Sequence, residues 1–151
     1  MSSLKSILKS AHSSTNTDEI KELVKAALQT QESDHQSWVE FGDICNTNQW
    51  QLAHQCFKRA VAADPNDAVS WFKLGLIDKA MGHKKEAIDH LTQSIELKIN
   101  AEVLEIRSEL YLETGHVQLA KEDSEAATCQ KKEQCKEGSM VPESWLKLTY
   151  H

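Results

Sequence analysis

The sequence contains little glycine and little proline, five and two respectively in 151 residues. An all-β fold built on many tight turns needs more of both, so the composition argues against that class. No apolar run approaches the length of a membrane span. The first residues, MSSLKSILKSAHSS, have too short an apolar region for a secretory signal. Because these residues are basic and rich in serine, a weak organelle-targeting signal is an alternative interpretation of them.

Cysteine is also scarce, and the four cysteines show no paired spacing: Cys45, Cys56, Cys129 and Cys135. With no secretory signal before them, this usage fits a reducing compartment, so we expect a cytoplasmic protein, with a nuclear location also open. The formal net charge of -6 argues against nonspecific binding of nucleic acid or of an anionic membrane.

What the sequence does contain is an internal repeat. Trp71 follows Trp38 by 33 positions, and each is followed by a large apolar residue and a glycine: Phe41 and Gly42, then Leu74 and Gly75. A second pattern, with a small residue at each end, recurs three times: Ala53, Phe57, Ala60; Ala87, Leu91, Ser94; Ala120, Ser124, Ala127. Gly82, Gly115 and Asn48 each stand five residues before such an alanine, where a left-handed turn residue is needed. Each unit is therefore predicted to be a helix, a tight turn and a second helix.

These residues resemble the tetratricopeptide repeat, whose signature runs W-x2-L-G-x2-Y, then A-x3-F, then P. The third unit contains WFKLG and AIDHL, the second contains WVEFG, AHQCF and Pro65, and the fourth contains LEIRSELY and Ala120. Leu4, Ile7 and Leu8 place a degenerate first unit in phase, followed by Asn16 or Thr17 as a helix cap. The sequence departs from the signature at Cys45 and Asp78, where tyrosine is usual, and at Ile99 and Lys132, where proline is usual.

The resemblance implies an all-α fold, a right-handed superhelical array of antiparallel helix pairs with a C-terminal capping helix. We expect a single domain over residues 1–151, with units at about 1–34, 35–67, 68–100 and 101–134 and a linker and capping helix at 135–151. Small residues such as Gly75 and Ala87 would let the two helices of a pair approach closely. No helix pair of this kind buries its apolar face alone, so neighbouring pairs stack. A four-helix bundle is an alternative, but it would not need this periodicity.

The C-terminal segment allows two interpretations. Residues 117–136 are predicted to form a long last helix, and Pro142 is well placed to begin another, PESWLKLTYH. Trp145 and Leu148 repeat the W-x2-L spacing. This segment is either a capping helix or the first helix of a fifth unit in a longer protein.

No catalytic motif stands out. The sequence has no glycine-rich phosphate loop, no G-x-S-x-G and no HExxH. Cys129 and Cys135 would face different ways on one helix, and His83 and His90 would lie roughly 10 Å apart along another. We therefore expect no enzyme activity, no metal site and no cofactor, with Cys45 and Cys56 acting as small buried apolar residues.

In the architecture that the resemblance implies, the first helices line a concave groove that binds a peptide or a helix. The residues expected to line it share a register on these helices: Lys5, Lys9, Val39, Glu40, Asp43, Phe72, Lys73, Leu76, Glu102, Glu105, Ile106 and Glu109. Val39, Phe72, Leu76 and Ile106 would form an exposed apolar patch, which is costly unless a partner covers it. Alternatively, Phe72 and Ile106 pack against each other or the next helix, and the glutamates form a solvated face.

The main hypothesis is a non-catalytic scaffold or adaptor that binds a protein segment with apolar anchors and basic flanks. The first alternative is an adaptor for acidic chaperone C-terminal tails. The two-carboxylate clamp of such adaptors is poorly matched, because its slots hold Lys5, Lys9, Glu40, Val69 and Lys73. The second alternative is a structural segment of a larger repeat assembly, joined through the C-terminal helix.

Overall fold

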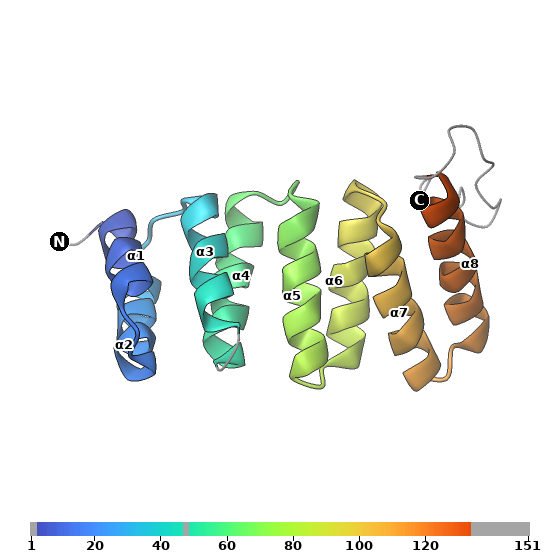
Figure 1. The fold of residues 1–151 in the computed structure, drawn as a ribbon, viewed down its shortest axis with the longest axis horizontal. Coiled ribbons are helices and arrows are strands. Elements are labelled where there is room, and N and C mark those ends of the chain that lie inside the picture. Colours follow the sequence, from blue (N-terminus) through green and yellow to red (C-terminus); the bar gives the residue numbers. More distant parts are fainter. Residues whose placement is uncertain (1–2, 47–48, 134–151) are drawn as a thin grey trace.

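The computed structural model describes residues 3–46 and 49–133, and in these ranges it contains eight α-helices and no strand. The helices are α1 (Leu4–Ser13), α2 (Thr17–Leu28), α3 (His35–Cys45), α4 (Trp50–Ala63), α5 (Ala68–Ala80), α6 (Lys84–Leu97), α7 (Ala101–Glu113) and α8 (Val117–Glu133). Consecutive helices form four pairs that stand side by side in chain order (Figure 1). This confirms the predicted all-α array of helix pairs. Asn48 and the predicted capping helix lie outside the described residues.

Short polar side chains begin most of the helices. Five N-cap side chains each accept a hydrogen bond from a backbone N–H of the first turn: Ser3, Asn16, Asp34, Asp67 and Asn100. They satisfy donors that a helix leaves unpaired at its start. Asn16 is the cap of α2, as one of the two predicted alternatives. By contrast, neither Gln49 before α4 nor His83 before α6 makes such a bond.

Two glycines form the turns inside the third and fourth pairs. Gly82 has φ 82° and Gly115 has φ 84°, and these are the positive φ values found among the described residues. Left-handed backbone strains a residue with a Cβ, so glycine is favoured at both positions. The predicted turns at these glycines are confirmed.

A second role of glycine is to let the two helices of a pair touch. A Cβ on Gly75 of α5 would lie 2.9 Å from Leu91 of α6 and 3.4 Å from the Ala87 carbonyl oxygen. A Cβ on Gly42 of α3 would lie 2.5 Å from the Phe57 ring of α4. The close approach predicted at Gly75 is therefore observed, and it recurs in the second pair.

The apolar core crosses the boundaries between pairs. One cluster contains residues of the first two pairs together with Leu74 and Ile77 of α5. A second cluster joins Leu91 and Ile95 of α6 to the fourth pair. The fully buried residues of the third pair thus divide between the two clusters, those of α5 in the first and those of α6 in the second, so stacking between pairs adds to the burial within each pair.

The fourth pair replaces part of this core with a buried ion pair. Arg107 occupies the position that Leu74 occupies one unit earlier, and its guanidinium donates to both Asp123 oxygens at 2.7 and 2.6 Å. Both residues are only 2% exposed, and Arg107 also donates to the Thr92 hydroxyl at 3.0 Å. The two charges can be buried at this site because they neutralise each other and are hydrogen-bonded to each other.

The last described helix presents a polar outer side. The α8 positions that correspond to Ile88, Leu91 and Ile95 of α6 hold Lys121, Ser124 and Thr128, all exposed. In α6 these positions contribute to the core shared with the next pair. Terminal units of repeat arrays need a polar outer face, and α8 presents polar side chains at these three positions.

We predict that Gly75→Ala destabilises the protein. In an open helix this change would stabilise by about 0.5–1 kcal/mol, but here the new methyl group would collide with Leu91 and cost about 1–3 kcal/mol. Urea-induced unfolding measures the sign. A more stable Gly75→Ala variant would contradict the close approach of α5 and α6.

We also predict that Asp123→Ala lowers the free energy of unfolding by about 3–5 kcal/mol, because it leaves the Arg107 charge buried without its partner. The double variant Arg107→Leu, Asp123→Ala should recover most of this loss, since leucine occupies the corresponding position in the third pair. Asp43→Ala, which removes an exposed ion pair, serves as the control and should cost less than about 1 kcal/mol. A double variant no more stable than Asp123→Ala would show that the charge is not the cause.

Candidate protein-interaction surface

We call the outward sides of α1, α3, α5 and α7 the first-helix face. It carries most of the residues predicted from the sequence. Those that are exposed are Lys5, Lys9, Asp43, Glu102, Glu105 and Glu109, and those that are half-buried are Glu40, Phe72, Lys73, Leu76 and Ile106. Val39 was expected to be exposed, but it is buried, with 9% of its surface accessible. The reason is that α3 contacts α1, α2 and α4, and Val39 lies in the first core cluster.

Three half-buried apolar residues remain on this face. Phe72 and Leu76 are four residues apart on α5 and so lie on one side of it, while Ile106 belongs to α7. Phe72 and Ile106 pack against the second core cluster. The alternative that these two side chains pack inward is therefore partly correct, and each still leaves part of its surface accessible.

Ion pairs connect successive first helices. His12 of α1 lies 3.1 Å from Glu40 of α3. Lys73 of α5 donates to both Asp43 oxygens of α3 at 2.8 Å, and Lys79 of α5 lies 2.8 Å from Glu109 of α7. Exposed pairs contribute little stability each, but they fix which charges remain available to a partner.

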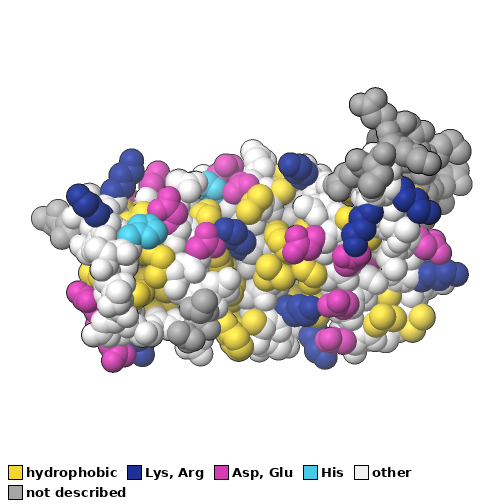
Figure 2. Space-filling model, in the orientation of Figure 1, with side chains coloured by type: hydrophobic (Ala, Val, Ile, Leu, Met, Phe, Trp, Pro, Cys, Tyr) yellow, Lys and Arg dark blue, Asp and Glu magenta, His cyan; other side chains and the backbone are white. Residues whose placement is uncertain are grey.

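The acidic side chains of α7 are largely balanced in the same way. Glu105 pairs with Lys131, Glu109 with Lys79, and Glu113 with Lys84 at 3.2 Å. Figure 2 shows Lys and Arg side chains next to Asp and Glu side chains on the face in view, with hydrophobic side chains between them. The expected gradient from a basic to an acidic end is weaker in the structure than in the sequence, because bases from other helices meet the α7 carboxylates.

The pKa of the Glu40 carboxyl is lowered by hydrogen bonds from His12 first and from Gln36 second. The carboxylate therefore stays charged, half-buried, between α1 and α3. A second carboxylate brought to this part of the face would be repelled by it. This bears directly on the chaperone-tail alternative, which would need to bind carboxylates here.

A histidine joins the starts of α3 and α5. His35 Nδ1 lies 2.9 Å from the Ala60 carbonyl oxygen, and His35 Nε2 lies 2.9 Å from Asp67 Oδ2. Both partners are acceptors, so both ring nitrogens must donate, which requires the protonated imidazolium. Burial lowers the pKa of His35, but the bonds to Ala60 and Asp67 outweigh it, and the pKa is raised from 6.5.

A buried carboxylate in the third pair was missed by sequence reasoning. Asp78, 1% exposed, occupies the tyrosine position of the repeat signature and hydrogen-bonds His90 Nδ1. His54 Nε2 lies 2.9 Å and His83 Nδ1 lies 4.0 Å from Asp78 Oδ1. A carboxylate in a packed helix position was the available signal, since a buried charge needs partners.

These side chains do not form a metal centre. Within residues 3–46 and 49–133, no group of three or more His, Cys, Asp or Glu residues has an arrangement that could hold a metal ion. Over the same ranges, no helix is long and apolar enough to span a membrane. Cys45 and Cys56 are buried as predicted; burial raises the pKa of the Cys45 thiol to about 11 and that of Cys56 further. Cys135 lies outside the described residues.

We predict that His35 makes stability fall as the pH rises. Because the folded pKa of His35 is raised, its contribution is fully present below the unfolded value near 6.5 and is lost as the pH passes through the folded value. The difference in the free energy of unfolding between wild type and His35→Gln, measured by urea titration, should therefore shrink between pH 6 and pH 8. A constant difference over this interval would show that the imidazolium is not required.

One known protein family matches part of this sequence. Residues 68–98 match the family model of the tetratricopeptide repeat. No curated protein sequence matches the chain significantly.

Solved structures of MamA share the fold. One MamA crystal structure has a TM-score of 0.76 at 20% identity and covers 89% of this chain and 82% of its own. A second has a TM-score of 0.74 at 21% identity over 93% and 80% of the two chains. MamA from Desulfovibrio magneticus RS-1 has a TM-score of 0.69 at 15% identity over 91% and 79%. Residues 68–98 therefore match a tetratricopeptide repeat by sequence, and the four stacked helix pairs share the α-solenoid fold of the MamA structures.

Proposed function

We propose that this chain is a non-catalytic scaffold or adaptor whose first-helix face binds a peptide or a helix of a partner protein. The observation that carries the proposal is the row of Phe72, Leu76 and Ile106, half-buried apolar side chains bordered by ion pairs. Burying the accessible part of such a row would supply affinity, at roughly 25 cal/mol for each Å². The neighbouring charges would set the orientation of the partner.

The charges on this face indicate which partner it suits. Glu102 is exposed at the start of α7, and Glu105 and Glu109 could exchange their lysine partners for basic groups of a bound segment. A segment with apolar anchors and basic flanks therefore fits best. Binding through exchanged ion pairs would give little net affinity but would reject acidic flanks.

The chaperone-tail alternative is disfavoured by two contacts. Lys73 is one of the basic residues in the clamp slots, but it already donates to both Asp43 oxygens. Glu40 follows the exposed Lys5 and Lys9 in the order of the clamp slots, and its negative charge would repel the carboxylates that the clamp binds. The structural-assembly alternative depends on Trp145 and Leu148, which lie outside the described residues.

Site-directed photo-crosslinking tests the proposal without removing a core side chain. A photoreactive amino acid replaces Leu76 on the first-helix face or, as the control, Gln93, which is exposed on α6. In cell extract, we expect the Leu76 position to capture discrete partner proteins that the Gln93 position does not capture. Thermal unfolding must first show that both variants keep the wild-type fold.

Competition identifies the chemistry of the partner. Peptides from the captured proteins that carry apolar residues and basic flanks should displace crosslinking at Leu76, whereas a peptide with an acidic C-terminus should not. Equal capture at Leu76 and Gln93 would contradict the first-helix face as the binding surface.

A further inference from the structure

A pocket lies between α2, the start of α4, and the end of α5 with the turn that follows it. Its volume is about 610 Å³, within the range of sites that take a large side chain or a small ligand. The lining residues come from α2, from the start of α4, and from the end of α5 with the following turn: Lys21, Gln49, Trp50, Gln51, Leu52, Ala80, Met81 and His83. None of these positions belongs to the first-helix face.

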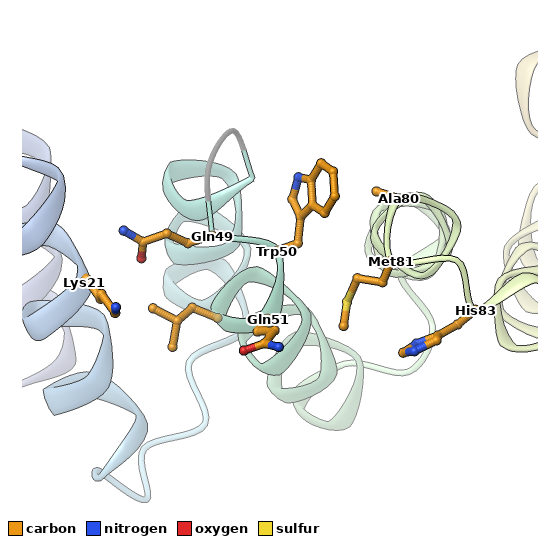
Figure 3. Close-up of a pocket in the computed structure, with 8 residues that line it drawn as sticks. Lys21, Gln49, Trp50, Gln51, Ala80, Met81 and His83 are labelled. Carbon is orange, nitrogen blue, oxygen red and sulfur yellow. The ribbon is translucent and has the colours of Figure 1, made fainter.

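Part of the pocket lining is apolar. Leu52 and Met81 pack against the first core cluster and so are held in place. Trp50 is 46% exposed, although it is one of the largest apolar side chains in the chain. Figure 3 shows Trp50 and Met81 between Lys21 on one side and His83 on the other. An indole left this accessible beside a pocket offers a surface against which an inserted apolar side chain can pack.

The ionisable side chains that line the pocket are basic. The lining contains Lys21 and His83 and no carboxylate, whereas the whole chain has a net charge of -6. The first turn of α6, which follows His83, carries the exposed Lys85 and also the exposed Glu86, and neither of them lines the pocket. Lys21 is exposed, so its charge is available to a ligand. Charge complementarity therefore favours an acidic ligand.

We propose that this pocket, which we call the turn pocket, is a second docking site, and that it binds an acidic segment of a partner protein by one inserted apolar side chain. The inserted side chain packs between Trp50 and Met81. The flanking carboxylates lie toward Lys21 on one side and toward His83 and Lys85 on the other. This site is separate from the first-helix face and selects the opposite charge.

The test uses synthetic acidic peptides in which four glutamates flank each side of a central Leu, Ile, Met, Phe or Trp. Binding is followed by the indole N–H resonance of Trp50 in the full chain, assigned with Trp50→Phe. We expect at least one of these peptides to shift this resonance at about tenfold lower concentration than the same peptide with glutamine flanks. A peptide with a central serine and the same glutamates should bind about tenfold more weakly as well.

Charge-reversal variants locate the site. With a fluorescent version of the best peptide, Lys21→Glu and Lys85→Glu should each weaken binding several-fold, and Trp50→Ala should abolish it. Lys58→Glu, at an exposed position of α4 that does not line the pocket, is the matched control and should bind as wild type does. Leu76→Ser should also leave this binding unchanged, which separates the turn pocket from the first-helix face.

Three results would overturn the proposal. The first is that none of the five acidic peptides shifts the Trp50 resonance at millimolar concentration. The second is that the serine-centred peptide binds equally well, or that a twelve-nucleotide oligothymidylate displaces the peptide, because the site would then respond to negative charge alone. The third is that Lys58→Glu weakens binding as much as Lys21→Glu does.

Discussion

The structure depends on one constraint: no helix pair in this chain can bury its apolar face alone. Leu74 and Ile77 of α5 complete a core made by the first two pairs, while Leu91 and Ile95 of α6 belong to the core of the fourth. Gly75 lets α5 and α6 approach closely, so the two cores are joined through the third pair. Stability is therefore a property of neighbouring units, as expected for a quasi-linear array.

Corresponding positions in the units hold quite different chemistry. Phe41, Leu74 and Arg107 occupy the same position of successive first helices, and Cys56, His90 and Asp123 occupy corresponding positions of the second helices. The backbone arrangement is the same in each unit because each combination of side chains either packs or pairs its buried groups. The first-helix face and the turn pocket both include side chains that pack against a core cluster and still leave part of their surface accessible, such as Phe72 and Met81. These two surfaces carry the proposed interactions, and their charges would let them select different partner segments.

Sequence reasoning could predict whatever depends on local spacing. The turns at Gly82 and Gly115, the Asn16 cap and the close approach at Gly75 all follow from a few neighbouring residues. It could not predict which residues of different units meet, because this depends on how the pairs stack. Val39 is buried for that reason, and Lys131 and Lys84 reach the α7 glutamates from helices that periodicity alone does not orient. The Asp78 histidines come from α4, the turn after Met81 and α6, so no sequence window contains them all.

The most direct test of this account is native-state hydrogen exchange of wild type and Leu91→Ala. Leu91 is fully buried in α6, so its truncation should cost about 2–5 kcal/mol. If neighbouring pairs stabilise one another, the amides of α5, α6 and α7 should lose protection together, while those of α1 lose the least. Loss of protection confined to α5 and α6 would contradict the account, because it would show that each helix pair is stable by itself.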